Sequence, residues 1–238
     1  MPKAMRRGKF GTATTESFRM LKLGFEKQAR RRYRILCLGA HSDDIEIGCG
    51  GTILELLRTR RDLEFQWVVF SSGKDRDREA RRSAALFLKG AAKQEVSVLD
   101  FRNSFFPSES EKIKEYFETL KAGAPPDLIL THTRHDLHQD HRVINQLTWN
   151  TWRNHFILEY EIPKYDGDLG RPNFFVPFDR KIAALKIKHL MSCFKTQGNK
   201  HWFTEDTFHG LMRIRGLESN SPGNFAEAYY ARKVVLDA

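Results

Sequence analysis

Two short runs of histidine and aspartate, far apart in this chain of 238 residues, carry the side chains best suited to catalysis. The first run reads Ala-His-Ser-Asp-Asp at 40–44, and the second reads His-Gln-Asp-His at 138–141. Catalytic zinc sites are built from imidazole and carboxylate ligands, with three protein ligands and a fourth position for water. The bound ion lowers the pKa of that water to about 7. The two runs together therefore predict a metal-dependent hydrolytic site.

Each side chain in the runs has a candidate role that its chemistry allows. The candidate metal ligands are two imidazoles and one carboxylate: His41, Asp44 and His141. Asp43, beside a ligand, is the candidate general base. His138 can reach the oxygen of a substrate carbonyl, and Asp140 can orient an imidazole from behind, a common device around metal sites. We expect His132 and His135, which precede the second run, to lie outside the site as structural or exposed residues.

A ligand set of two histidines and one carboxylate is also typical of non-haem iron oxygenases. Their facial triad uses a His-x-Asp spacing on a β-barrel, whereas this chain has His-x-x-Asp in a strand–helix pattern. The spacing therefore favours the hydrolytic site over the oxygenase.

The segments around the runs alternate between strand and helix patterns. Short apolar runs predict strands at 34–39, 65–71, 95–101, 127–132 and near 156–162. Helical spacing predicts helices at 52–61, from Asp77 onward, at 109–122 and from His141 to about His155. This alternation predicts a Rossmann-like, doubly wound α/β fold, in which a mostly parallel sheet carries helices on both faces.

This fold explains how the distant runs can meet. The first run follows the first predicted strand, and the segment from His132 to His141 follows the fourth. Ligands of doubly wound sheets bind outside the carboxyl ends of the strands. In the common strand orders the first and fourth strands can lie side by side, so the two runs can face one crevice.

Two further segments have weaker patterns. Residues 164–179 are rich in Gly, Pro and Asp, and we expect them to form a loop. The segment 179–194 predicts a helix with Asp179 as its N-cap, followed by a short helix near 205–213 and an apolar stretch at 228–236. The glycines after the first run lack the spacing of a phosphate-binding loop, and we expect them to form a tight turn into the next helix: Gly48, Gly50 and Gly51.

The net charge of +10 is concentrated in a basic leader. Residues 1–34 hold eleven Lys and Arg against two acids, whereas the rest of the chain holds 29 against 28. Apolar residues within 15–33 recur at helical spacing, so the leader is expected to be helical. We divide the chain into this leader (1–33) and a single catalytic domain (34–238).

Three interpretations of the leader stay open. It can pack on the domain or on a second subunit of a homo-oligomer, bind an anionic membrane surface, or bind nucleic acid. Nucleic acid is the least favoured partner, because the main body is close to neutral. The corresponding alternative to an enzyme is a basic binding protein with a non-catalytic metal site.

Composition also points to a compartment. No apolar run approaches the ~20 residues of a transmembrane helix, and no secretory signal is visible. Three cysteines without a paired motif are typical of a reduced, cytosolic protein. We expect a cytoplasmic protein, with peripheral membrane association through the leader as the alternative.

Four segments of the chain resemble motifs of the PIG-L/LmbE-like deacetylases. AHSDDIEIGCGGT at 40–52 resembles their first motif, Ala-His-Pro-Asp-Asp, with Ser42 where Pro or Ala is more usual. THTRHDLHQDHR at 131–142 resembles their second motif, including Asp136 and Arg142. REARRSAALFL resembles the helix after their second strand, which Arg76 and Glu79 open in the spacing R-x-x-E, and NFAEAYY resembles their C-terminal motif.

The resemblance implies a zinc-dependent N-deacetylase that acts on a small-molecule conjugate of N-acetylglucosamine, with Fe²⁺ as the alternative native metal. It implies the same metal ligands: His41, Asp44 and His141. It also implies Asp43 as the base, His138 as the group that stabilises the oxyanion, and Arg76 as a contact to the sugar. Either Asp43 or His138 would protonate the leaving amine.

Overall fold

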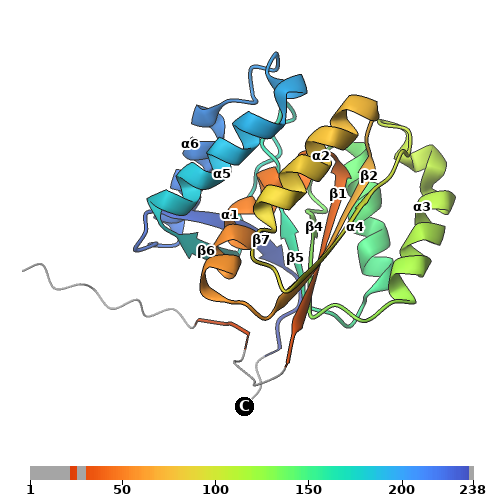
Figure 1. Ribbon diagram of the computed structural model, residues 1–238, viewed down its shortest axis with the longest axis horizontal. Coiled ribbons are helices and arrows are strands. Elements are labelled where there is room, and N and C mark those ends of the chain that lie inside the picture. The colour runs from red at the N-terminus through yellow and green to blue at the C-terminus, as the bar shows by residue number, and fades with distance from the viewer. Residues whose placement is uncertain (1–21, 26–30, 236–238) are drawn as a thin grey trace, which may run out of the picture.

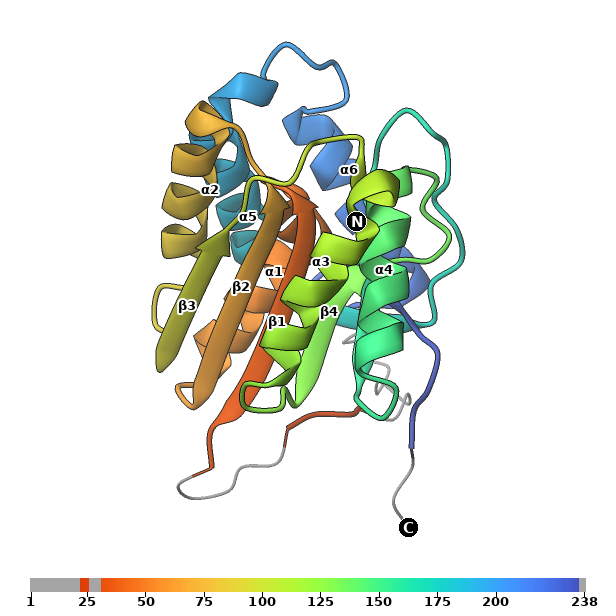
Figure 2. The same ribbon diagram turned by 90° about the vertical axis from the view of Figure 1, so that its right-hand side faces the viewer.

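The computed structural model describes residues 22–25 and 31–235 of the chain. Most of the predicted leader helix lies outside these residues, and 22–25 have no regular secondary structure. The described chain forms three layers, in which a sheet lies between two groups of helices (Figures 1 and 2). This is the predicted α/β architecture.

The sheet has seven strands in the order β3-β2-β1-β4-β5-β7-β6. Strands β1 to β5 pair in parallel, while β7 is antiparallel to both of its neighbours, so the sheet is mostly parallel as predicted. The strand bounds are β1 Tyr33–His41, β2 Leu63–Ser71, β3 Lys93–Val98, β4 Leu128–His132, β5 Ile157–Tyr160, β6 Phe174–Phe178 and β7 Phe225–Ala231.

Strand β6 corrects the prediction of a loop over 164–179. It lies at the edge of the sheet, where Val176 pairs with Glu227 of β7. Its sequence contains Pro177, which has no N–H to donate and is tolerated chiefly in edge strands. Because Gly, Pro and Asp residues surround this strand, its sequence has no clear strand pattern. The strand is recognised only from its pairing with β7.

The helices cover both faces of the sheet. Helices α1, α2, α5 and α6 lie on one side, and α3 and α4 lie on the other (Figure 2). Asp179 caps α5 as predicted, because its Oδ1 accepts hydrogen bonds from the N–H groups of Lys181 and Ile182. The helix bounds are α1 Asp44–Thr59, α2 Lys74–Phe87, α3 Phe106–Lys121, α4 Gln139–Thr151, α5 Arg180–Cys193 and α6 Glu205–Glu218.

Apolar side chains on each face of the sheet form a separate core. The larger core packs β1 and β2 against α1, α2 and α5, and Trp67 and Tyr160 are among its fully buried members. The smaller core packs the opposite face against α3 and α4 around Phe70 and Phe117. Among the helices of the described residues, none has the length and hydropathy to cross a membrane.

Helix α1 begins at Asp44, so the prediction of a tight turn at the three glycines is wrong. Gly48, Gly50 and Gly51 lie within the helix and face large neighbours. A Cβ on Gly50 would lie 2.5 Å from Cε1 of Phe87, and one on Gly51 would lie 2.7 Å from the ring of Phe178. The glycines therefore allow α1 to approach the sheet and α2 closely, rather than allowing a turn.

We predict that Gly48→Ala destabilises the fold, because a Cβ there would lie 2.5 Å from Cγ of Tyr160. The buried Tyr160 ring cannot move away easily, since its hydroxyl donates a 2.6 Å hydrogen bond to the carbonyl of Leu38. Overpacking of this kind costs about 1–3 kcal/mol, measured as the free energy of unfolding in denaturant. Gly210→Ala is the matched control within α6, where no atom lies within 4 Å, and equal loss in both variants would contradict the steric explanation.

Candidate active site

The two polar runs meet at the carboxyl ends of β1 and β4, which pair in parallel as neighbours. His41 is the last residue of β1, and Asp44 is the first residue of α1. His138 is the N-cap of α4, and His141 lies in the first turn of that helix. The predicted adjacency of the first and fourth strands therefore brings residues from both runs to one point.

Three polar atoms converge there with the spacing that a metal ion requires. Nδ1 of His41 lies 3.1 Å from Nε2 of His141 and 3.3 Å from Oδ2 of Asp44. The distance between Nε2 of His141 and Oδ2 of Asp44 is 3.5 Å. Ligand atoms about 2.0–2.2 Å from a tetrahedral zinc ion lie about 3.3–3.6 Å from one another. These residues fit a zinc-sized cation.

A carboxylate behind each imidazole determines which nitrogen faces this point. Nε2 of His41 lies 3.2 Å from Oδ2 of Asp140, and Nδ1 of His141 lies 2.8 Å from Oδ2 of Asp136. A neutral histidine that donates to a carboxylate has its lone pair on the other ring nitrogen. When both rings are neutral, as ligation requires, both lone pairs point toward the Asp44 carboxylate, and a cation would replace the proton that His41 carries without it.

Backbone groups hold Asp140 in place. Its Oδ2 accepts a 2.6 Å hydrogen bond from the N–H of Ser104, and its Oδ1 accepts one of 3.1 Å from Phe106. The structure thus places Asp140 behind the imidazole of His41.

Asp43 lies next to the converging atoms and contacts Arg76. Burial raises the pKa of the Asp43 carboxyl, and the nearby guanidinium of Arg76 acts in the opposite direction. Nη2 of Arg76 donates a 2.8 Å hydrogen bond to Oδ1 of Asp43. The residue predicted to contact a sugar is therefore in contact with the predicted base.

His138, the N-cap of α4, also lies close to this point. Its ring centroid lies 4.9 Å from that of His41 and 4.6 Å from that of His141. Burial, and then the charge on His41, lowers the pKa of His138, which favours a neutral ring. Nδ1 of His138 accepts a 3.2 Å hydrogen bond from the N–H of Asp140, so in the neutral ring the proton is on Nε2.

Comparison with known proteins identifies the family of this chain. The sequence model of the PIG-L family, described as GlcNAc-PI de-N-acetylase, matches residues 36–152, which contain both polar runs. The uncharacterized deacetylase YaiS of Escherichia coli (strain K12) is 30% identical over 179 residues, and the match covers 68% of this chain and 92% of YaiS. The chain belongs to the PIG-L family.

Solved structures share the fold of this PIG-L protein at lower identity. N,N'-diacetylchitobiose deacetylase from Pyrococcus horikoshii matches with a TM-score of 0.63 at 18% identity, over 83% of each chain. GalB, the 4-carboxy-2-hydroxymuconate hydratase from Pseudomonas putida, matches with a TM-score of 0.65 at 15% identity, over 87% of this chain and 98% of GalB. Because a deacetylase and a hydratase share the fold, the fold alone does not specify the reaction.

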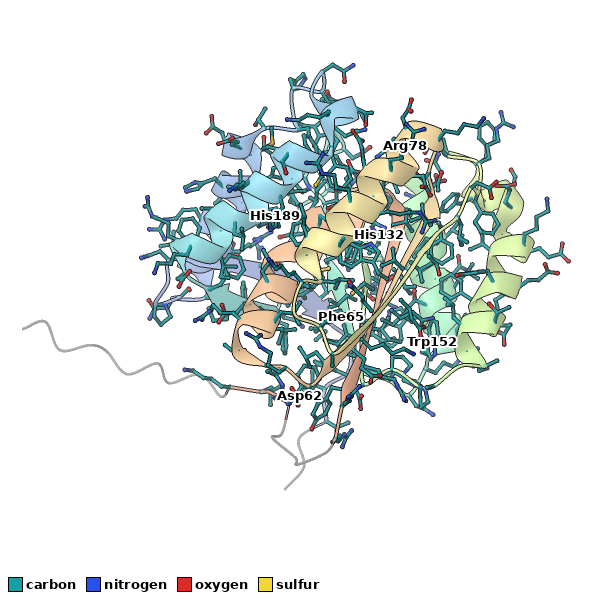
Figure 3. All side chains as sticks on the ribbon, in the orientation of Figure 1. Asp62, Phe65, Arg78, His132, Trp152 and His189 are labelled. Carbon is teal, nitrogen blue, oxygen red and sulfur yellow. The ribbon has the colours of Figure 1, made fainter. Side chains whose placement is uncertain are left out.

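His132 corrects our expectation that it lies outside the site of the PIG-L protein. It is fully buried in the interior (Figure 3), and its ring stacks on His141 with a centroid distance of 3.9 Å. Its Nε2 lies 3.2 Å from Oδ2 of Asp44 and 3.0 Å from the backbone nitrogen of Ala40. Its position as the last residue of β4, beside the strand that ends in His41, was the sequence signal that we missed.

Two other residues complete the comparison between sequence and structure. His135 is exposed, as expected. Asp136, which the sequence singled out only as part of a motif, is buried and contacts His141. The described residues contain two further sets of groups that could hold a metal ion: His41 with His138 and His141, and Asp44 with His132 and His141.

We predict that His41 is protonated at pH 7 in the metal-free PIG-L protein. Burial opposes the charge, but the Asp44 and Asp140 carboxylates raise the pKa of His41 from 6.5 to about 9. This proton adds stability in full below pH 6.5, and the added stability is lost as the pH rises through about 9. Histidine ring NMR should show His41 charged at pH 7, with a lower midpoint in Asp140→Asn.

His141 is the internal comparison in the same spectra. Burial, with a smaller electrostatic effect of the neighbouring His132, lowers its pKa to about 4, so its ring should be neutral at pH 7. A neutral His41 at pH 7 would contradict the prediction that the Asp44 and Asp140 carboxylates outweigh the effect of burial on its pKa.

Proposed function

We propose that this PIG-L protein is a metal-dependent deacetylase that removes the acetyl group from an N-acetylglucosamine-type conjugate. The products are acetate and the free amine. The observation that carries the proposal is the convergence of two imidazole nitrogens and one carboxylate oxygen at 3.1–3.5 Å, beside the buried carboxyl of Asp43. Its similarity to YaiS, an uncharacterized deacetylase, supports the reaction class.

The ligands in this proposal are His41, Asp44 and His141. The ion is Zn²⁺, with Fe²⁺ as an alternative that the same donor atoms can hold. When bound, the ion supplies Lewis acidity that activates water and polarises a carbonyl group. We assign His132 a supporting role, because its Nε2 already faces the backbone N–H of Ala40 while it contacts the Asp44 carboxylate.

Asp43 acts as the general base. Its Oδ1 accepts a hydrogen bond from Arg76, which leaves Oδ2 to take a proton from the attacking water. The water oxygen then bonds to the amide carbonyl carbon, and the carbonyl oxygen gains the negative charge. The neighbouring Arg76 cation favours the charged form of Asp43 that this step needs.

His138 acts as the oxyanion donor, with Asp140 orienting His41 behind the reacting centre. The neutral ring of His138 has its proton on Nε2 and can donate it as a hydrogen bond to the developing oxyanion. The proton that Asp43 took from the water then passes to the nitrogen, and the carbon–nitrogen bond breaks; with a neutral His138 ring, we assign this transfer to Asp43. Arg76 also contacts the sugar in this proposal, since 23% of its side chain is exposed beside Asp43.

The proposal is tested by an amine-release screen over N-acetylglucosamine conjugates with metal-reconstituted protein. Asp43→Asn should lower kcat by roughly 10²–10⁴-fold, the contribution of a general base, while zinc stays bound. Asp75→Asn is the matched control, because Asp75 is exposed on the neighbouring helix α2. Normal turnover by Asp43→Asn would reject the base assignment, and release of no amine by the wild-type protein would reject the reaction.

The ligand assignment has a separate test in the metal content. His41→Ala should remove stoichiometric zinc after dialysis, because only two of the three converging donors remain. The exposed His135 provides the control, and His135→Ala should retain one zinc ion per chain. A full complement of zinc in His41→Ala would exclude His41 from the ligand set.

A further inference from the structure

The loop after β5 is tied to the second polar run by Lys164, a partly buried residue whose side chain is largely covered. Nζ of Lys164 lies 3.0 Å from Oδ2 of Asp136 and forms a second ion pair with Asp168. Oδ2 of Asp168 also accepts a 2.8 Å hydrogen bond from the N–H of Leu137. The side chains of the three charged residues are only 9%, 1% and 5% exposed, in the order Lys164, Asp136 and Asp168.

Asp136 is the point at which this loop reaches the candidate ligands. Its Oδ2 is shared by Nζ of Lys164 and by Nδ1 of His141, which lies 2.8 Å away. Its Oδ1 accepts a 2.8 Å hydrogen bond from the N–H of His138. Burial disfavours the charged carboxyl, but His141 and Lys164 are among the groups that hold the pKa of Asp136 well below its ordinary value.

The same loop carries exposed apolar side chains at the carboxyl ends of the strands, where the site lies. Tyr165 is 64% exposed and Leu169 is 44% exposed, and the Tyr165 ring lies 4.9 Å from that of His201. Because ligands of such sheets bind outside the carboxyl ends of the strands, these side chains lie where a bound conjugate would extend.

We propose that Lys164 is a positioning residue, which holds the Asp136 carboxylate in the orientation that aims Nε2 of His141 at the metal. Together with Asp168 it also fixes the 163–170 loop as part of the substrate rim. A buried carboxylate that loses its cation must turn toward water or another donor, since an unpaired buried charge is costly. The hydrogen bond from Nδ1 of His141 would then loosen. The positioning role rests on the proposed metal site, and the role in the substrate rim rests on the proposed deacetylase activity.

A second lysine, which is buried, provides a control for simple loss of stability. Nζ of Lys186 lies 2.6 Å from Oε1 of Glu227, with side chains 3% and 4% exposed. This pair joins α5 to β7, and within the described part of the chain Lys186 contacts none of the candidate ligands. Lys186→Met therefore breaks a buried ion pair of the same kind away from the metal.

The experiment measures zinc affinity by chelator competition without substrate, together with melting temperature, KM and kcat. Lys164→Met should weaken zinc binding about 10–100-fold, the usual effect of losing a group behind a ligand. Lys164→Arg, which restores the charge, should recover most of that affinity. Asp168→Asn should keep zinc affinity but raise KM, because it frees the loop and leaves Lys164 on Asp136.

Lys186→Met should lower the melting temperature and leave zinc affinity unchanged. Unchanged zinc affinity in Lys164→Met, or an equal loss in Lys186→Met, would overturn the positioning role. If Lys164→Met does not fold, Lys164→Gln gives the same test, because a neutral amide also removes the charge. If no conjugate is deacetylated but the zinc affinities follow this pattern, the proposed reaction fails and the positioning role stands.

Discussion

The parallel pairing of β1 with β4 is the contact on which the candidate site depends. Ile35 pairs with Leu128 and Cys37 with Leu130, so the carboxyl ends of both strands reach the same edge of the sheet. Helices α1 and α4 begin within a few residues of those ends and carry the remaining ligands inward. Register matters here because side chains alternate between the faces of a strand, and a slip of one residue would turn His41 away from its partners.

The site concentrates buried negative charge, and the surrounding residues compensate for it. Asp43 and Asp136 lie within a few residues of the ligands and have side chains 6% and 1% exposed. Each is paired with a cation from another element, Arg76 of α2 for Asp43 and Lys164 of the loop after β5 for Asp136. Buried carboxylates persist only when paired or hydrogen-bonded. A divalent cation at the point of convergence would compensate the remaining negative charge, because it would bind the Asp44 carboxylate and two imidazole lone pairs.

Close packing in the larger core connects the site to the rest of the fold. Gly48 of α1 lies against the ring of Tyr160, whose hydroxyl donates to the carbonyl of Leu38 and lies 3.3 Å from Nε2 of His132. Helix α1, which begins with Asp44, therefore packs against Tyr160, and the same side chain contacts His132. The precision of the donor positions depends on this packing as well as on the polar groups themselves.

The fold class, the central strands and the two polar runs could all be inferred from the amino-acid sequence. Strongly apolar strands such as 65–71, and helices with a clear period, carry their own local signal. Local pattern also placed His41 and Asp44 just after the first predicted strand and His141 in the segment after the fourth, on the side where a doubly wound sheet binds its ligands. The recognition of the PIG-L family likewise depended on short contiguous motifs.

Features that depend on residues far apart in the chain could be recognised only once the chain was folded. Strand β6 exists because β7 pairs with it, and the glycines of α1 are explained by the rings of Phe87, Tyr160 and Phe178. Lys164 has no local pattern that marks it, since its role comes from Asp136, 28 residues away in the chain. His132 ends a strand, but its contact with the backbone of Ala40, 92 residues away, depends on how β1 and β4 pair. Periodicity reports the environment of a segment, whereas the partners of a buried polar group depend on how the segments pack.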